Sequence, residues 1–375
     1  MKLFSCQQCQ QTLFFENVQC TRCGLMLAYL PDRALLSALE PVPDSGGQGA
    51  SPKYQALGAD GAIYRLCRNY SDQAVCNWAV PDGDPEEFCR ACRLNHLIPN
   101  LSDPQAKAAW QRIEIAKRRL LYTLLGLGLP VETKQENPAS GLAFDFLKDD
   151  PSTQTPQVFT GHNDGLVTIN INEADDPFRE KMRVQMGEPY RTLLGHFRHE
   201  IGHYYWDRLI KDGPRLYEFR QLFGDERDSY QEALDRHYQQ GPPPNWTERF
   251  VSAYASMHPW EDWAETWAHY LHMVDTLQTA RAYGLSLRPK TGALSQVSLT
   301  ARWLDLHSFE DLIAGWIPLT VALNSLNRSM GAPDSYPFVL TEAAIVKLRF
   351  VHDVVETWAS GTENTRHKAP TARVA

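Results

Sequence analysis

The residues best suited to chemistry form an HExxH motif at positions 199–203 of this 375-residue sequence. On an α-helix, positions four apart lie on one face, so His199 and His203 can bind one zinc ion. Glu200 then lies beside the open coordination position, where it can take a proton from zinc-bound water. Because the motif also occurs by chance in long helical proteins, its interpretation depends on a third ligand and on the surrounding elements.

A third ligand is expected from the segment 254–272, in which tryptophans at helical spacing form one apolar face. Glu261, Glu265 and His272 share another face. Two carboxylates at the edge of a buried helix are costly unless they meet a cation or hydrogen-bond donors. A zinc ion held by the motif would be such a cation, and a solvated acidic face is the alternative.

Three further polar residues lie close to these positions in the sequence. Asp207 follows His203 by one helical turn, where it could orient a ligating side chain but is awkwardly placed to bind zinc directly. His196 and His258 are expected to be ordinary polar residues. We therefore rank Glu261 ahead of Asp207 as the third ligand.

All eight cysteines fall before residue 93, in two sets of four. The sets are Cys6, Cys9, Cys20 and Cys23, and Cys67, Cys76, Cys89 and Cys92. CxxC turns bring thiolates together, so each set predicts a four-sulfur zinc site, with His96 as an alternative ligand in the second. Four thiolates leave zinc no open position, so both sites are expected to be structural. Disulfides or a redox pair are the alternative reading.

The overall composition limits the classes of function. The net charge is -8 and the isoelectric point is near 5.9, which argues against a general nucleic-acid binder despite four arginines at positions 65–93. The longest nearly uncharged apolar run, 120–131, is too short to span a bilayer. No signal peptide is recognisable at the start, so a cytoplasmic location without membrane association is expected.

The elements that must position these residues predict an α+β protein. The expected parts are a zinc-ribbon module (1–100), a mainly helical zincin-like metallopeptidase domain with a small antiparallel sheet (101–359) and a disordered tail (360–375). A helix is predicted from Asp103-Pro104 to about Leu125. Strands are predicted at 155–159 and 166–171, joined by a turn at 162–165. The second strand is the candidate edge that would align an extended peptide.

Between the two cysteine sets, the Gly/Pro/Ser-rich segment 41–52 predicts a flexible loop.

The region around the motif resembles gluzincin metallopeptidases such as anthrax lethal factor and Mlc titration factor A. In those proteins a tyrosine lies seven residues before a glutamate, and a second acidic residue follows shortly after. The matching positions are Tyr254, Glu261 and Glu265. The resemblance implies that Glu261 is the third zinc ligand, that Glu265 orients a ligating histidine, and that Tyr254 stabilises the oxyanion. Over residues 1–355 the chain also resembles bacterial zinc-ribbon proteins described as putative zinc-binding metallopeptidases.

Together these observations predict a zinc metallopeptidase of the HExxH-plus-Glu type with one catalytic and up to two structural zinc ions. Glu200 would assist the attack of zinc-bound water on a peptide or protein substrate. The zinc ribbon could also bind a protein partner. The alternative is a non-catalytic zinc-binding scaffold or protein-interaction protein with a degenerate peptidase domain.

Overall fold

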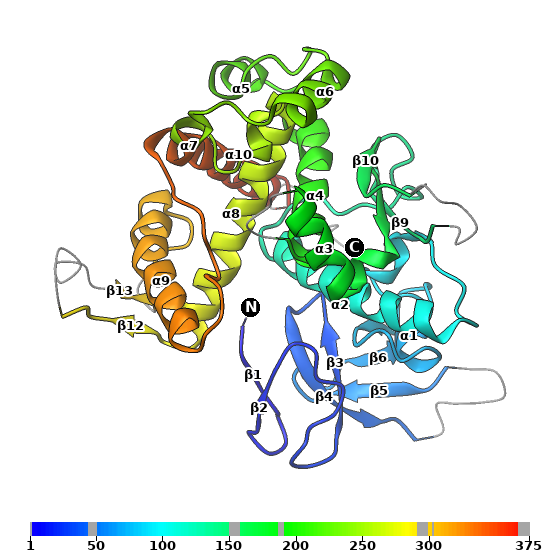
Figure 1. The fold of residues 1–375 in the computed structure, drawn as a ribbon. Helices are drawn as coiled ribbons and strands as arrows, with labels where there is room; N and C mark the ends of the chain where they lie inside the picture. The colour runs from blue at the N-terminus through cyan, green and yellow to red at the C-terminus, as the bar shows by residue number, and fades with distance from the viewer. Residues whose placement is uncertain are drawn as a thin grey trace.

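The computed structural model describes residues 2–43, 51–149, 158–186, 191–290, 299–301 and 304–366. Figure 1 shows a cysteine-rich β part at the N-terminal end and a mainly helical part above it. This arrangement confirms an α+β protein with an N-terminal cysteine module and a helical C-terminal region.

The N-terminal part is built from short antiparallel strands. A two-stranded sheet contains β1 (Phe4–Ser5) and β2 (Thr12–Leu13). A five-stranded sheet contains, in spatial order, β3 (Met26–Leu30), β4 (Leu35–Pro41), β5 (Lys53–Ala56), β6 (Ile63–Leu66) and β7 (Ala79–Pro81). The segment predicted as a flexible loop joins β4 to β5, and its residues 44–50 lie outside the described residues. The short helices α1 (Arg68–Ser71) and Cys92–Leu94 complete this part.

The helix α2 (Pro104–Gly126) confirms the helix predicted from Asp103-Pro104. Asp103 caps its N-terminus by accepting a hydrogen bond from the backbone N–H of Gln105 at 2.9 Å. One face of α2 receives the cysteine module: the ring centroid of Phe15 lies 5.2 Å from that of Tyr122. The two parts of the chain thus share one continuous apolar core.

A mixed four-stranded sheet has the order β10 (Gly161–Asn163), β11 (Leu166–Asn170), β9 (Ala143–Leu147) and β8 (Asn95–Leu97). Only β10 and β11 are antiparallel, whereas β9 pairs in parallel with both of its neighbours. Within this sheet, the expected antiparallel pairing holds only for the β10–β11 hairpin; the C-terminal region also contains the antiparallel pair β12–β13. Since β8 precedes residue 101, the sheet also crosses the predicted domain boundary.

The predicted edge strand, 166–171, is wrong as an edge: it forms β11, which lies between β10 and β9. Among the described residues, the outer strands of this sheet are β10 and β8. Asp164 and Gly165 join β10 to β11 in a two-residue turn with positive φ angles of 48° and 79°. Such a tight turn places His162 and Asn163 in the strand rather than in the turn. Of the strand predicted at 155–159, residues 155–157 lie outside the described residues.

The rest of the chain is mainly helical. Its elements are α3 (Asp176–Met186), α4 (Leu193–Leu209), α5 (Leu216–Phe223), α6 (Tyr230–Gln240), α7 (Trp246–Arg249), α8 (Pro259–Ala282), β12 (Ser286–Leu287), β13 (Leu299–Thr300), α9 (Phe309–Ser329) and α10 (Glu342–Arg366). Because α10 continues to Arg366, it extends past residue 360, where the tail was expected to begin. Residues 367–375 lie outside the described part. Among the described helices, none is long and apolar enough to cross a membrane.

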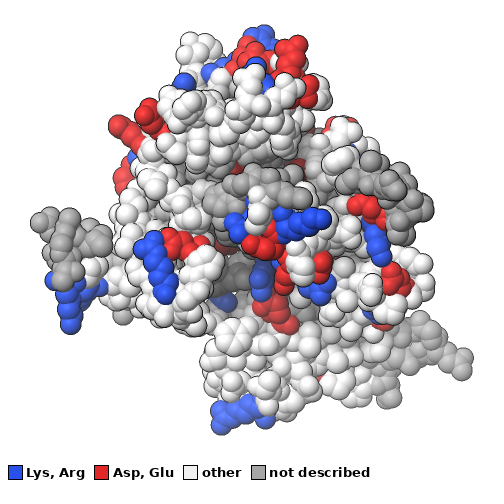
Figure 2. All heavy atoms as spheres, in the orientation of Figure 1, with Lys and Arg blue, Asp and Glu red and all other residues white. Residues whose placement is uncertain are grey.

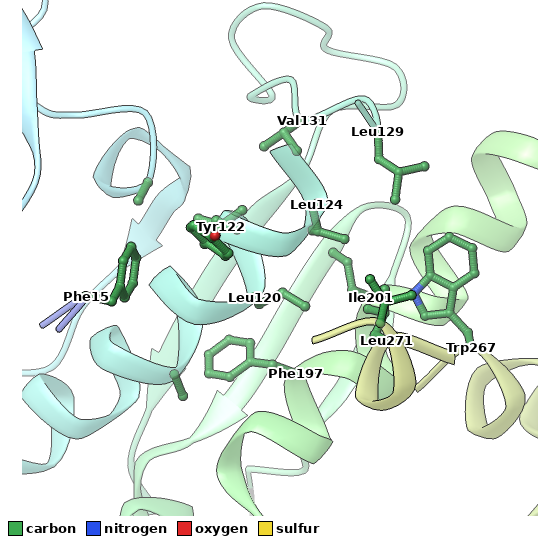
Figure 3. Close-up of a cluster of buried hydrophobic side chains, with 14 of the residues drawn as sticks. Phe15, Leu120, Tyr122, Leu124, Leu129, Val131, Phe197, Ile201, Trp267 and Leu271 are labelled. Carbon is green, nitrogen blue, oxygen red and sulfur yellow. The ribbon is translucent and has the colours of Figure 1, made fainter. Parts of the chain in front are cut away.

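The helices α4 and α8 cross at close range, and Gly202 permits this approach. A Cβ atom at Gly202 would lie 3.0 Å from the Cα of Ala264 and 3.2 Å from the Cβ of Trp267. The indole N–H of Trp263 donates to the Gly202 carbonyl at 2.8 Å. Apolar side chains from α2, α4 and α8 fill the space between these helices, as Figure 3 shows. The HExxH helix is therefore held rigidly from two sides.

Basic and acidic side chains lie next to one another over much of the face in Figure 2, rather than in one continuous basic patch.

Candidate metal centres

The helix α4 presents the two histidines of the motif on one face. Thr192 caps its N-terminus through a 3.0 Å hydrogen bond from the backbone N–H of Gly195. The helix begins soon after, at Leu193, so His199 and His203 both fall in its regular interior. Their Nε2 atoms lie 3.3 Å apart. Both imidazoles can therefore face a single ion.

The helix α8 brings the third side chain to the same point. His258 caps this helix by accepting a hydrogen bond from the backbone N–H of Trp260 at 3.1 Å, which places Glu261 in the first turn. The Oε2 atom of Glu261 lies 2.9 Å from His199 Nε2, and its Oε1 atom lies 3.4 Å from His203 Nε2. The three side chains each offer one ligand atom, and these atoms lie within 4.8 Å of one another.

These separations fit a tetrahedral zinc site. Ligand atoms about 2.0–2.1 Å from zinc lie about 3.3 Å from each other in a tetrahedron. In addition, Glu261 Oε2 is buried and has no hydrogen-bond partner within the described residues, although it faces His199 Nε2. A cation between these lone pairs would satisfy this oxygen. The residues present thus fit zinc without rearrangement of the helices.

Glu265 and Ser252 fix the orientation of His199. Glu265 Oε1 lies 2.7 Å from His199 Nδ1, and the hydroxyl of Ser252 donates to Glu265 Oε2 at 2.6 Å. This chain of contacts leaves Nε2 of His199 directed at Glu261, the arrangement common for histidines that bind metal. Burial by itself lowers the pKa of His199, but the adjacent carboxylates of Glu261 and Glu265 raise it well above its usual value.

Glu200 is buried beside the two histidines, with 8% of its surface exposed. Burial raises the pKa of this carboxyl group, whereas the charges of His199 and His203 act in the opposite direction. A carboxylate with a raised pKa next to a metal position is suited to accept a proton and return it.

Two tyrosines complete this region, and only one of them was expected. Tyr254 lies in a 3-10 turn, Tyr254–Ser256, with its ring centroid 6.0 Å from that of His199. Burial raises the pKa of Tyr254, so its hydroxyl stays a donor at neutral pH. Tyr230, at the start of α6, was missed: its hydroxyl donates to Glu261 Oε1 at 2.9 Å. No spacing links Tyr230 to the motif, so only the fold reveals it.

Four other candidate residues lie outside the group of three. Asp207 forms an ion pair with Lys211 at 3.3 Å, and His272 contacts Arg198. His196 Nδ1 lies 3.5 Å from a carboxylate oxygen of Glu173. His258 acts as the helix cap described above.

A cavity of about 500 Å³ is lined by side chains that neighbour the metal ligands. Trp260 forms part of its wall and packs against His203, with ring centroids 4.1 Å apart and the ring planes tilted by 50°. The lining residues are His162, Asn163, Asp164, Trp206, Asp207, Lys211, Glu226, Tyr230, His258 and Trp260. None of the three ligands lines the cavity, but Tyr230 and Trp260, which contact Glu261 and His203, join it to the site, and its other wall includes His162 and Asn163 of β10. A cavity of this size could receive a substrate side chain.

The eight cysteines form two compact groups of four, and all are free thiols. In the first group, the Sγ atoms of Cys6 and Cys23 lie 3.6 Å apart and those of Cys9 and Cys20 lie 3.5 Å apart. Four sulfurs about 2.3 Å from zinc would lie about 3.8 Å apart, whereas a disulfide measures about 2.05 Å. The geometry thus excludes disulfides here and fits a metal.

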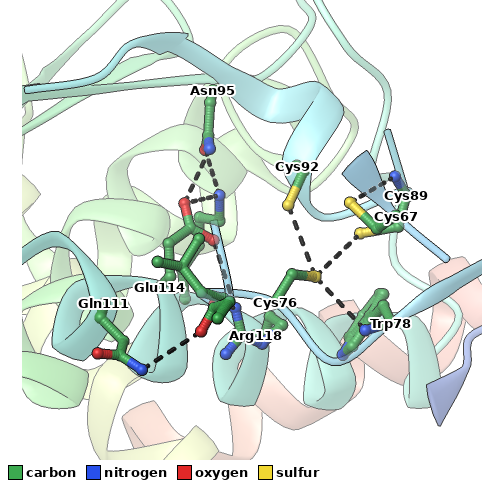
Figure 4. Close-up of polar contacts among 12 residues, drawn as sticks. Cys67, Cys76, Trp78, Cys89, Cys92, Asn95, Gln111, Glu114 and Arg118 are labelled. Atoms are coloured by element: carbon green, nitrogen blue, oxygen red, sulfur yellow. Dashed lines mark hydrogen bonds and ion pairs between the residues drawn. The ribbon is translucent and has the colours of Figure 1, made fainter. Parts of the chain in front are cut away.

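The second group has the same geometry: Cys76 Sγ lies 3.7 Å from the Sγ atoms of both Cys89 and Cys92. Figure 4 shows this group with the neighbouring residues of α2. His96 does not join it, since His96 Nδ1 lies 2.8 Å from Asp145 Oδ1 instead. The alternative of a histidine ligand in this group therefore finds no support in the fold.

Buried charges of α2 lie beside the second group. Arg118 is 4% exposed and donates to the carbonyl of Val75 at 2.6 Å. It also lies 3.6 Å from Glu114, which pairs with Lys117 at 2.8 Å. The charges of nearby groups, Cys76 first, raise the pKa of Arg118 despite the opposing effect of burial. A helix of the C-terminal region thus supplies a cation to the cysteine module.

Comparisons with known proteins match both regions. The family described as "Putative zinc-binding metallo-peptidase" matches residues 106–354, and a zinc-ribbon domain family matches residues 3–103. Similar proteins include uncharacterized proteins of Mycobacterium bovis and of two strains of Mycobacterium tuberculosis. Each is 43% identical over 364 residues, which cover 97% of this chain and 98% of the relative. No solved structure matches. The two family descriptions and the cysteine groups support zinc as the metal.

Proposed function

We propose that this chain, which belongs to the putative zinc-binding metallo-peptidase family, hydrolyses peptide bonds. The zinc ion would be held by His199, His203 and Glu261. The observation that carries this proposal is the convergence of these three side chains from two rigidly crossed helices. Glu200 lies buried beside them. A purely structural site would not need such a base.

In the mechanism that we propose, Glu200 accepts a proton from the attacking water and delivers it to the leaving amine. A zinc ion bound at this site supplies a Lewis acid that polarises the scissile carbonyl and lowers the pKa of water. The hydroxyl of Tyr254 donates a hydrogen bond to the developing oxyanion. Glu265 holds the ring of His199 in the orientation that ligation requires.

These residue roles are the ones expected of a gluzincin with a zincin-like catalytic domain. We therefore propose that the protein is a metallopeptidase of that class. Two further zinc ions would occupy the cysteine groups, giving three per chain. Free thiolate sites of this kind suit a reducing compartment, in agreement with the expected cytoplasmic location.

The substrate is proposed to be an extended segment of a peptide or protein. Its backbone would pair with the free edge of β10, and one side chain would enter the cavity beside Trp260. The docking of a protein partner at the zinc ribbon remains compatible with this arrangement.

Native mass spectrometry combined with a peptide-library cleavage assay tests the proposal. Wild type should carry three zinc ions and His199→Ala two. Glu200→Gln should retain three and lose hydrolysis by roughly 10²- to 10⁴-fold. Undiminished cleavage by Glu200→Gln would refute the mechanism. Three zinc ions in wild type without any cleavage would favour the non-catalytic scaffold.

A further inference from the structure

Tyr230 is the one hydrogen-bond donor to Glu261 that the described residues show outside the two ligand histidines. It is the first residue of α6, and Ser229 caps that helix by accepting a hydrogen bond from the backbone N–H of Glu232 at 3.3 Å. The cap fixes where α6 begins. The position of Tyr230 over Glu261 therefore follows from local structure.

The hydroxyl of Tyr230 distinguishes the two oxygens of Glu261. Oε1 accepts its hydrogen bond at 2.9 Å, while Oε2 has no hydrogen-bond partner within the described residues and faces His199 Nε2 at 2.9 Å. A carboxylate with one oxygen occupied in this way presents the other to a metal. Without the hydroxyl, only the contacts with the two ligand histidines would set the rotation of the carboxylate about its last bond.

The ring of Tyr230 packs between the cap of α8 and the cavity wall. Its centroid lies 5.3 Å from that of His258 and 6.3 Å from that of Trp260. Since Tyr230 is 37% exposed and only Ala233 of α6 is buried, the residue is not a core residue on which folding depends.

We propose that Tyr230 is a positioning residue, whose hydroxyl holds Glu261 as a one-oxygen zinc ligand. The proposal rests on the proposed zinc site, but it does not require that the protein cleaves any particular substrate. Hydrogen-bond partners of metal-binding carboxylates typically change metal affinity by about 10- to 100-fold.

The test is the zinc affinity of Tyr230→Phe, measured by competition with a chelator and counted by native mass spectrometry. The variant keeps the ring and removes only the hydroxyl. We expect affinity at the histidine-dependent site to fall about 10-fold or more, with both cysteine sites unchanged. Tyr217→Phe is the matched control, because Tyr217 is 75% exposed on the neighbouring α5, and it should bind zinc as wild type does.

A double-variant comparison separates positioning from general structure. In a His199→Ala background, Tyr230→Phe should change neither the remaining zinc count nor the unfolding temperature. Equal zinc affinities of wild type and Tyr230→Phe would overturn the proposal, as would parallel losses at the cysteine sites. If wild type binds zinc at the His199-dependent site but cleaves no peptide, the proposed hydrolysis fails while the role of Tyr230 is still decided by affinity.

Discussion

The two regions of this chain gather their candidate metal ligands in opposite ways. In the cysteine module, each CxxC turn supplies two ligands within four residues, and four thiolates would enclose an ion completely. In the C-terminal region, two ligands lie on α4 and the third on α8, and the site opens beside a cavity of about 500 Å³. The first arrangement encloses its centre with ligands from one module, whereas the second joins two helices and leaves its centre near a cavity.

The two regions also differ in which reactive side chains they contain. All eight cysteines precede residue 93 and all twelve histidines follow residue 95. Oxidants and thiol reagents should therefore modify mainly the cysteines of the first region. Mild acid should protonate mainly the histidines of the second region. Each variant below tests whether the two regions are as different as their geometry indicates.

The largest effect is expected when one enclosed site is broken. Cys76 is buried in the second cysteine group, and its replacement by Ser should remove that zinc ion and unfold much of the N-terminal module. Structural zinc contributes about 10 kcal/mol or more to the folding of small domains. Circular dichroism and native mass spectrometry would measure this loss. Glu261→Gln, by contrast, should lower zinc binding only at the open site and leave the fold intact. Equal damage by both variants would remove the distinction.

A smaller loss is expected from Arg118→Met. This change removes a buried cation from the vicinity of the second cysteine group and leaves the carbonyl of Val75 without its donor. Breaking a buried charge contact of this kind costs about 3–5 kcal/mol. Denaturant unfolding would measure it, with Arg112→Met on the exposed side of α2 as control. If both variants unfold at the same denaturant concentration, α2 does not support the cysteine module through this charge.

The acid sensitivity of the helical region should depend in part on His269. Burial lowers the pKa of His269 to about 4, and its Nδ1 atom lies 2.6 Å from the hydroxyl of Tyr336. The unfolded chain binds this proton near pH 6.5, so the stability is present above that pH and is lost as the pH falls towards 4. A shift of this size is worth about 3 kcal/mol.

Unfolding free energies of wild type and His269→Gln between pH 7 and 4 would measure this contribution. The variant should show a shallower loss with falling pH. Identical pH profiles would mean that His269 titrates normally in the folded protein.

The smallest effect is expected from Asp207→Asn, which tests the alternative third ligand. Asp207 is paired with Lys211, whose side chain is 56% exposed, and such a pair contributes about 0–1 kcal/mol. The zinc count should remain at the wild-type value, and cleavage should change only through the cavity wall. Loss of the histidine-dependent zinc in this variant would assign ligation to Asp207 and weaken the role given to Glu261.

The sequence was sufficient wherever a local pattern fixes the geometry. The CxxC turns, the cap at Asp103 and the four-residue spacing of His199 and His203 all predict contacts within one element. The acidic residues on the second helix needed a partner, and the resemblance to gluzincins, through the spacing from Tyr254, ranked Glu261 ahead of Glu265. The structure brings Glu261 to the two histidines.

What the sequence did not reveal depends on loops that set the position of one element against another. Tyr230 reaches Glu261 across 31 residues, and Ser252 reaches Glu265 across 13. Neither pair has a periodic pattern. The edge was assigned to β11 because its alternating apolar residues are conspicuous, whereas the three residues of β10 carry no such pattern. His272, by contrast, lies in the predicted helix, but its side chain contacts Arg198 rather than the three candidate ligands.

The strand β8 has a consequence for how the chain is made. It follows the last cysteine by only three residues, yet its partner β9 begins 46 residues after β8 ends, counting from Leu97 to Ala143. During synthesis the cysteine module is complete on the ribosome while α2 and β9 are still being translated. Zinc binding can therefore fold the cysteine module first. The strand β8 is then already in place when β9 is made and pairs with it in parallel. The order of the chain thus lets the cysteine groups bind metal before the residues of α4 and α8 have been translated.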